Sequence, residues 1–184
     1  MKRDSWFPKR YADTVAKLRV PSGFLLVLAF AWLSSPTIGS LIWGLPVSLV
    51  GLLLRAWSAG HLNKNLRLAT GGPYACTRNP LYLGTLVVAA GLVIASRQWT
   101  LAALFAGVFV FVYLPVIELE QQHLRSLFPG YAAYAARVPM LWPRIPPIPS
   151  EGSFQFAQYW KNQEYNALAG FLAGVALLVW KALR

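Results

Sequence analysis

Two charged side chains, Arg78 and Glu120, lie where the sequence pattern gives them a chemical role. Arg78 stands in the stretch GGPYACTRNPLYLG, which predicts a turn and then a helix, because Asn79 can cap a helix and Pro80 fits its first position. A cation just ahead of a helix N-terminus lies where the helix dipole already favours anions, so Arg78 should bind one. A lipid phosphate and a cofactor carboxylate would both satisfy it.

Glu120 lies in IELEQQHLRSLF, at the end of an apolar run. If the helix ends there, its dipole disfavours the carboxylate; if the helix continues, Glu120 is an ionisable group at the membrane boundary. Helical spacing places Glu120 on one face with Leu124 and Leu127, whereas Glu118 points about 160° away. The two carboxylates therefore form no acid–base pair, and for Glu118 we favour pairing with Arg125 or another loop cation.

Three further side chains are candidates for catalysis or metal binding: His61, His123 and Cys76. Each histidine is interpreted first as an interfacial hydrogen-bonding residue, and it would act as a base only for an acceptor that must lose a proton. Cys76 is interpreted as a small turn residue, and as the single cysteine it excludes an internal disulfide. No local ligand spacing supports a zinc site, so we predict no metal.

Composition decides which elements must position these residues. The chain has 184 residues, of which 57% are hydrophobic and only 12% charged, far too apolar for an ordinary soluble domain. The net charge of +11 invites a nucleic-acid role, but the basic residues are grouped at the ends of apolar runs instead of forming one patch. This distribution indicates a polytopic membrane protein and no nucleic-acid partner.

Five apolar runs are each close to the roughly 20 residues that cross a bilayer as a helix. We therefore predict an all-α fold with about five transmembrane helices, at Val20–Ile38, Ser40–Trp57, Leu81–Ser96, Thr100–Ile117 and Ala167–Trp180. The first run is interpreted as a retained helix and not as a signal peptide, because 19 residues precede it. Pro36 and Gly39 predict a tight hairpin after it.

The positions of Lys and Arg predict the orientation. Of the 17 basic residues, 14 fall in segments 1–19, 55–78 and 125–161, so the positive-inside rule places these segments and the N-terminus in the cytoplasm and the C-terminus outside. In a bacterium this would be the inner membrane. Both large polar segments, 58–80 and 118–165, would then face a water-soluble cosubstrate.

The second polar segment contains two candidate surface helices. Tyr131, Tyr134 and Val138 have the spacing of an amphipathic helix on the membrane surface, which either closes over a site or anchors the chain. After a Pro-rich connector, segment 155–165 reads as another amphipathic helix.

Glycines indicate how the membrane helices approach one another. Gly84 and Gly91 lie on one helix face and permit close helix packing, while Gly170 and Gly174 form a GxxxG spacing that would suit a dimer face. Gly84 would equally let a cofactor approach the backbone. We divide the chain into an N-terminal basic segment and hairpin (1–57), a core (58–143) and a C-terminal region (144–184).

Together these motifs resemble the isoprenylcysteine carboxyl methyltransferase and phospholipid methyltransferase superfamily of small integral membrane enzymes. The likeness is carried by an ordered set over about residues 58–143: Gly72, Pro73, Tyr74, Arg78, Asn79, Pro80, Tyr82, Gly84, Glu120, Leu124, Phe128, Gly130, Tyr131, Tyr134, Val138 and Pro139.

The resemblance implies S-adenosylmethionine as cofactor, in a cytoplasm-facing pocket that a lipophilic or lipidated acceptor enters from the bilayer lipids. It implies cofactor contacts from Gly72, Pro73, Tyr74, Arg78, Asn79, Pro80, Tyr82, Gly84, Glu120, Gln121, Tyr131 and Tyr134, with Glu120 facing the cofactor's cationic part. The catalytic residue stays open among Glu120, His61 and His123.

Two positions depart from the pattern of this superfamily. Asn79 stands where His is common, and it can cap and donate but cannot titrate. Gln121 stands where a second Glu is common, and the lost charge would weaken attraction for a cationic cofactor or substrate.

Four functions follow from these features. The leading one is carboxyl O-methylation of an isoprenylcysteine-like acceptor, and the second is N-methylation of a phospholipid amine. A reductase of the sterol-reductase type would need NADPH, but no Gly-x-Gly-x-x-Gly is present. A non-catalytic lipid-binding protein is the fourth. The sequence leaves the oligomeric state open.

Overall fold

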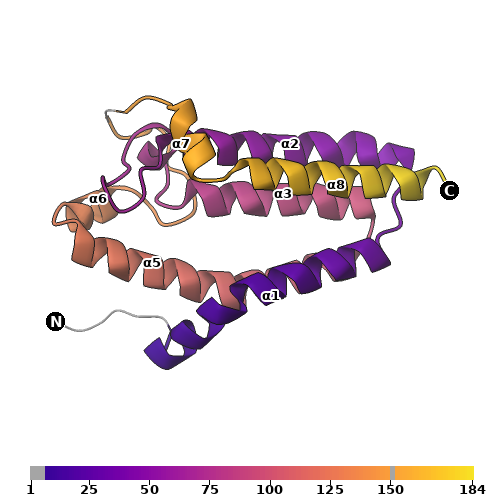
Figure 1. The fold of residues 1–184 in the computed structure, drawn as a ribbon, viewed down its shortest axis with the longest axis horizontal. Helices are drawn as coiled ribbons and strands as arrows, with labels where there is room; N and C mark the ends of the chain where they lie inside the picture. Colours follow the sequence, from indigo (N-terminus) through magenta and orange to yellow (C-terminus); the bar gives the residue numbers. More distant parts are fainter. Residues whose placement is uncertain (1–6, 150–151) are drawn as a thin grey trace.

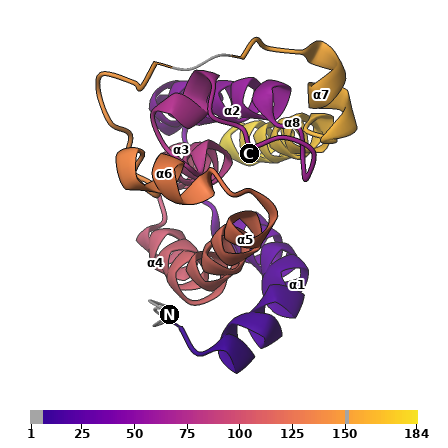
Figure 2. The same ribbon diagram turned by 90° about the vertical axis from the view of Figure 1, so that its left-hand side faces the viewer.

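The computed structural model describes residues 7–149 and 152–184, and every regular element in them is helical. The helices form two layers (Figures 1 and 2). One layer contains α2 (Ile38–His61), α3 (Pro80–Ser96) and α8 (Tyr165–Ala182); the other contains α1 (Lys9–Leu33), α4 (Trp99–Val108), a π-helical turn η2 (Phe109–Tyr113) and α5 (Leu114–Leu127). The short elements η1 (Gly72–Ala75), α6 (Tyr131–Arg137) and α7 (Phe156–Lys161) gather at one end, opposite the C-terminus.

In the described residues, four helices are long and apolar enough to cross a membrane: α1, α2, the continuous helix Trp99–Leu127, and α8. The apolar helix α3 is shorter, at 17 residues. Large apolar side chains of α1 point away from the protein, such as Phe24, which is 66% exposed. The fold is therefore the all-α polytopic membrane protein that the sequence predicted, with four helices long enough to span and one shorter apolar helix in place of about five spans.

The turn between α1 and α2 lies where the sequence predicted it, but the predicted end of the first helix is wrong. α1 ends at Leu33 and not at Ile38, because Thr37 caps α2: its side chain accepts from the Ser40 amide while the Ser40 side chain accepts from the Thr37 amide. Polar residues of the turn take up backbone groups that would otherwise be exposed to lipid. The helix also begins earlier than the apolar run, at Lys9.

Helices α2 and α3 pack with their backbones in contact along a seam of small residues. A Cβ on Gly51 would lie 2.5 Å from the Val88 nitrogen, and one on Gly91 would lie 2.4 Å from the Ser48 nitrogen. The Ser48 hydroxyl donates to the Val88 carbonyl at 2.9 Å. The close approach predicted for Gly84 and Gly91 is confirmed, and it makes α2 and α3 a closely packed helix pair.

Proline chemistry ties α1 to η2 within its own layer. Pro115 has no amide hydrogen to donate to the carbonyl of Phe111 four residues earlier. The Tyr11 hydroxyl of α1 donates to that carbonyl instead, at 2.7 Å. At the opposite end, the Lys181 ammonium of α8 donates to the carbonyls of Ala31 and Trp32, at 2.9 and 3.3 Å, where the dipole of α1 favours a cation.

The two C-terminal helices differ in length from the prediction. α7 covers only Phe156–Lys161 instead of segment 155–165, and α8 begins at Tyr165. No other part of the described chain comes within 4 Å of a Cβ built on Gly170 or Gly174.

The glycine seam predicts a substitution pair of opposite sign. Gly51→Ala should destabilise the protein by about 1–3 kcal/mol, because its methyl group forces α2 and α3 apart. Gly170→Ala, in an open position of α8, should be neutral or slightly stabilising. Thermal unfolding in detergent measures both, and equal effects of the two substitutions would contradict the seam.

Candidate functional site

A cavity of about 1220 Å³ lies between the two helix layers, at the end where the short elements gather. Its wall takes residues from the middle of α1, the end of α2, most of α5, the starts of α3 and α8, and the loop 62–69. Six of the residues predicted to bind a cofactor line it: Tyr74, Arg78, Tyr82, Glu120, Tyr131 and Tyr134. The other six predicted residues are not on this wall: Gly72, Pro73, Asn79, Pro80, Gly84 and Gln121.

Backbone hydrogen bonds hold the turn before α3 against residues 139–148. The Arg78 amide donates to the Pro139 carbonyl at 2.9 Å, and the Arg144 amide donates to the Cys76 carbonyl at 2.9 Å. The Thr77 hydroxyl lies 3.1 Å from the Met140 carbonyl. The turn before α3 is thereby fixed against the segment that follows α6.

The first candidate surface helix, α6, faces inward. Tyr131, Tyr134 and Val138 are all buried and pack in one cluster with Ala75 and Ile148. The Tyr134 hydroxyl donates to the Tyr74 carbonyl at 2.7 Å. The predicted helix over these residues is confirmed, and it covers the end of the cavity.

Burial raises the pKa of each of three phenols, those of Tyr74, Tyr131 and Tyr134, above the ordinary value of a tyrosine. Desolvation is the main cause for each of the three phenols, because it disfavours the phenolate. These tyrosines are therefore neutral hydrogen-bonding groups at physiological pH.

Asn79 does not cap α3 with its side chain, so that prediction is wrong. It occupies the N-cap position without a side-chain cap hydrogen bond, and its amide nitrogen donates to the Met140 carbonyl at 2.8 Å. Pro80 is the first residue of α3, as predicted. The Asn79 side chain thus joins the start of α3 to the segment that follows α6.

Arg78 enters the cavity as a partly satisfied cation. Its Nη1 donates to the Gln121 side-chain oxygen at 3.0 Å and lies 3.5 Å from the Tyr131 hydroxyl, whereas its buried Nε has no partner. Gln121 holds the guanidinium without cancelling its charge, which a glutamate in that position would do. Arg78 therefore keeps its positive charge for an anion in the cavity.

Glu120 lies in the middle of a helix, because α5 continues to Leu127. Its Oε1 accepts from the Tyr82 hydroxyl at 2.9 Å and lies 3.6 Å from Nη1 of Arg19. Glu118 does not line the cavity, and its Oε1 accepts from the Gln122 amide on the same helix. The two carboxylates thus have separate surroundings, as the helical spacing predicted.

The histidines lie in different places. Nδ1 of His61 is 2.9 Å from the Trp57 carbonyl, and the residue lines a separate cavity of about 190 Å³. Gly72, with φ of +56°, lies against this imidazole, because a Cβ there would be 2.6 Å from Nε2. His123 lines the larger cavity. Within residues 7–149 and 152–184, no three His, Cys, Asp or Glu side chains group as metal ligands.

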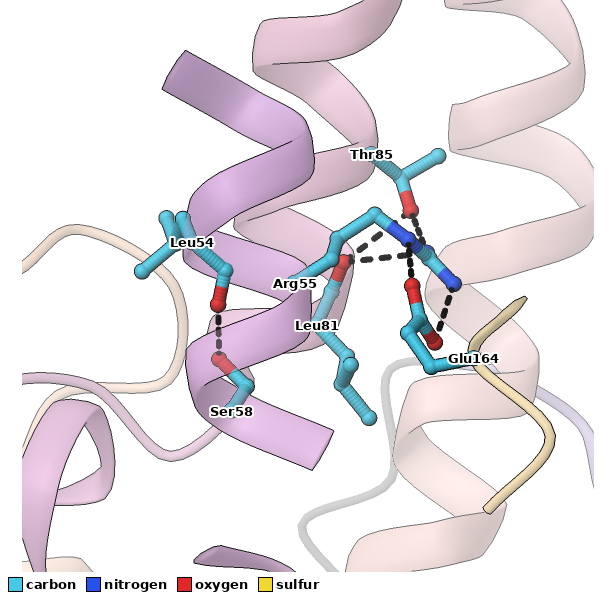
Figure 3. A network of polar contacts seen from close by, with 6 residues as sticks. All are labelled: Leu54, Arg55, Ser58, Leu81, Thr85 and Glu164. Carbon is cyan, nitrogen blue, oxygen red and sulfur yellow. Dashed lines mark hydrogen bonds and ion pairs between the residues drawn. The ribbon is translucent and has the colours of Figure 1, made fainter. Parts of the chain in front are cut away.

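The sequence analysis missed an ion pair in the cavity wall. Arg55 of α2 binds Glu164 in bidentate geometry, with Nε–Oε1 at 2.6 Å and Nη2–Oε2 at 2.9 Å, and its Nη1 also donates to the Thr85 hydroxyl and the Leu81 carbonyl (Figure 3). Glu164, just before α8, is only 6% exposed. A cation inside the apolar run 40–57 was the available signal, since such residues require a partner.

This pair predicts a double-mutant cycle. Glu164→Leu should destabilise the protein by about 3 kcal/mol, because it leaves Arg55 without its counter-charge, whereas Arg55→Met combined with Glu164→Leu should be close to neutral. Thermal unfolding in detergent gives the four corners of the cycle. Additive effects of the two single substitutions would contradict the coupling.

The arrangement defines an integral membrane protein with a polar cavity at one end of its helical layers, and the chain belongs to the superfamily of membrane methyltransferases named above. A family model described as phospholipid methyltransferase matches residues 40–130. No solved structure matches the chain with significance.

Three curated proteins illustrate the relationship. The cobalt-zinc-cadmium resistance protein CzcN of Cupriavidus metallidurans is 37% identical over 59% of this chain and 49% of its own length. The nickel-cobalt-cadmium resistance protein NccN of Alcaligenes xylosoxydans is 35% identical over 67% and 57%. The protein-S-isoprenylcysteine O-methyltransferase of Schizosaccharomyces pombe is 29% identical over 75% and 61%. The matches thus span from about half to three-fifths of the relatives' own lengths.

Proposed function

We propose that this protein is an S-adenosylmethionine-dependent methyltransferase that acts on a lipophilic acceptor from the membrane. One observation carries the proposal: Arg78 from the turn before α3 and Glu120 from α5 line the same cavity. The family match and the isoprenylcysteine methyltransferase relative support the reaction class.

The charged groups fit such a cofactor. Arg78, on the cavity wall, offers its guanidinium to a carboxylate, which binds a guanidinium best through charge-assisted hydrogen bonds. Glu120, with 46% of its side chain exposed, offers a carboxylate to an ammonium or a sulfonium. S-adenosylmethionine has one anionic and two cationic groups, so opposite charges find partners on the cavity wall.

The cavity also has room for a second ligand. Its volume of about 1220 Å³ exceeds the roughly 300–1,000 Å³ of ordinary small-molecule sites. Apolar side chains of α5, such as Val116 and Leu119, lie on the same wall as the charged groups. A lipid chain would pack against them while its polar end reached the charged part of the wall.

The bound cofactor would supply an electrophilic methyl group, and the residues of the chain would supply alignment. Arg78 and Glu120 would fix the two charged ends of the ligand, because methyl transfer needs reacting atoms held in line at about 3–3.5 Å. The apolar wall would keep water from the reacting groups. The buried tyrosines are neutral and move no proton in this scheme.

His123 is the candidate base on the wall if the acceptor is an amine that must lose a proton, whereas His61 lines the other cavity. Asn79 and Gln121 hold structure in the protein, Asn79 through Met140 and Gln121 through Arg78. Neither departure from the superfamily pattern removes a group that the proposed chemistry requires. With the predicted orientation, the cavity would open to the cytoplasm.

Ligand binding tests the proposal directly. Calorimetric titration in detergent should show saturable binding of S-adenosylhomocysteine and none of NADPH. Arg78→Ala and Glu120→Ala should each weaken binding by about tenfold or more, because each removes a charged partner. Arg137→Ala removes an exposed cation that does not line the cavity and should leave the affinity unchanged.

Two results would overturn the proposal. Binding of NADPH alone would indicate a reductase, and binding of neither ligand would indicate a non-catalytic membrane protein. Transfer of a radioactive methyl group from S-adenosylmethionine to a lipid extract would then identify the acceptor.

A further inference from the structure

We propose that Arg19 is the specificity residue for the acceptor: it pairs with Glu120 in the ligand-free site and binds an anionic acceptor once the cofactor has engaged Glu120. This inference rests on the proposed function and deepens it, by naming the charge of the acceptor group and the order of binding. Arg19 belongs to α1 and lies outside residues 40–130, which the family model matches.

The surroundings of Arg19 show a cation held at the cavity wall. Its guanidinium carbon lies 5.7 Å from the ring centre of Tyr82 and 5.9 Å from that of Tyr113. These two rings meet edge to face, with their centres 6.1 Å apart. The cation therefore has a stacking site that does not depend on Glu120.

The contact with Glu120 is easily exchanged. Nη1 of Arg19 lies 3.6 Å from Oε1 of Glu120, and the two side chains are 45% and 46% exposed. Solvated ion pairs of this kind change an equilibrium by only up to about fivefold. A ligand cation that bound Glu120 would release Arg19 while the tyrosine rings kept the guanidinium in place.

The charges on the cavity wall favour an anionic acceptor. Its cationic residues are Arg19, Arg55, Lys64, Arg67 and Arg78, against the two carboxylates of Glu120 and Glu164. Glu164 already neutralises Arg55 in the buried pair. With the cofactor on Arg78 and Glu120, an amine acceptor would meet unpaired cations, whereas an anion would find Arg19.

The position of Arg19 along the membrane helix also fits an acceptor with a lipid chain. The neighbouring Val20 lines the cavity, yet it is largely exposed on the outer surface of α1. Ala16, one turn earlier on the same helix, lines the cavity as well. A lipid chain at this edge would lie along apolar residues while its charged end reached the guanidinium.

With an anionic acceptor, methyl transfer neutralises one negative and one positive charge and needs no base. A carboxylate oxygen of the acceptor forms a bond to the methyl carbon, the carbon–sulfur bond breaks, and its electron pair moves to sulfur. The carboxylate and the sulfonium become a neutral ester and a neutral thioether, with no proton transferred. The ester no longer attracts Arg19, which can return to Glu120 as the products leave.

Three probes with one farnesyl chain test this inference: N-acetyl-S-farnesylcysteine, which carries a carboxylate, its neutral carboxamide, and S-farnesylcysteamine, which carries an amine. In calorimetric titrations of the wild-type protein, S-adenosylhomocysteine should tighten binding of the carboxylate probe about two- to fivefold and leave the amide unchanged. The carboxylate probe should tighten binding of S-adenosylhomocysteine by the same factor, since coupling between two ligands is reciprocal.

The variants separate Arg19 from general effects of charge. Arg19→Gln should abolish the coupling and bind S-adenosylhomocysteine about two- to fivefold more tightly, because the competitor for Glu120 is gone. Arg19→Lys should retain most of the preference for the carboxylate. Lys17→Gln removes an exposed cation from the same helix outside the cavity and should behave as the wild type.

The outcomes distinguish this inference from the proposed function. Undiminished coupling in Arg19→Gln, or tighter binding of the amine than of the carboxylate, would overturn the role of Arg19 while S-adenosylhomocysteine still bound. Failure of the wild-type protein to bind S-adenosylhomocysteine would instead overturn the proposed function. Binding of S-adenosylhomocysteine by Arg19→Gln, with unchanged thermal unfolding, shows that the variant is folded.

Discussion

The backbone hydrogen bonds between segments 75–78 and 139–148 are the constraint on which the site depends. They join a turn before α3 to a segment that follows α6, although more than 60 residues separate the amide of Arg78 from the carbonyl of Pro139. Because these bonds use main-chain groups, they fix the path of both segments with little regard to side chains. Arg78 is thereby brought to the middle of α5, where it bonds the Gln121 side chain.

The membrane helices supply the frame for this junction. The glycine seam leaves no space between α2 and α3, so the large cavity forms between this helix pair and the layer of α1 and α5. Lys181 of α8 joins the two layers at the end of α1, and within the second layer Tyr11 joins α1 to Phe111. Each contact satisfies a backbone carbonyl that lipid could not satisfy.

The sequence predicted the parts of this design that depend on local chemistry. Apolar runs predicted the membrane helices, and the Asn79-Pro80 pair predicted the start of α3, because hydropathy and proline geometry act over a few residues. Helical spacing separated Glu120 from Glu118, since it needs only the period of one helix. Tertiary contacts were beyond this kind of argument: the Asn79 side chain bonds Met140 instead of its own helix.

The same limit explains why half of the predicted cofactor contacts lie off the cavity wall. A motif places residues along the chain, but only packing decides which side chains reach a cavity: Gly84 packs on α2, and Gly72 lies under His61. Conversely, Arg55 and Glu164 are 109 residues apart, so no sequence motif contains both.

Electrostatics explains why these charges sit where they do. A charge in the membrane region is costly unless it is paired or hydrated, and the protein uses both solutions side by side. The Arg55–Glu164 pair is buried, bidentate and further bonded to α3, so it holds three helices together. Arg78 and Glu120 are instead left with weak or neutral partners. Charges that are fully paired within the protein hold structure, whereas those left under-paired at a cavity wall are the ones able to bind a charged ligand.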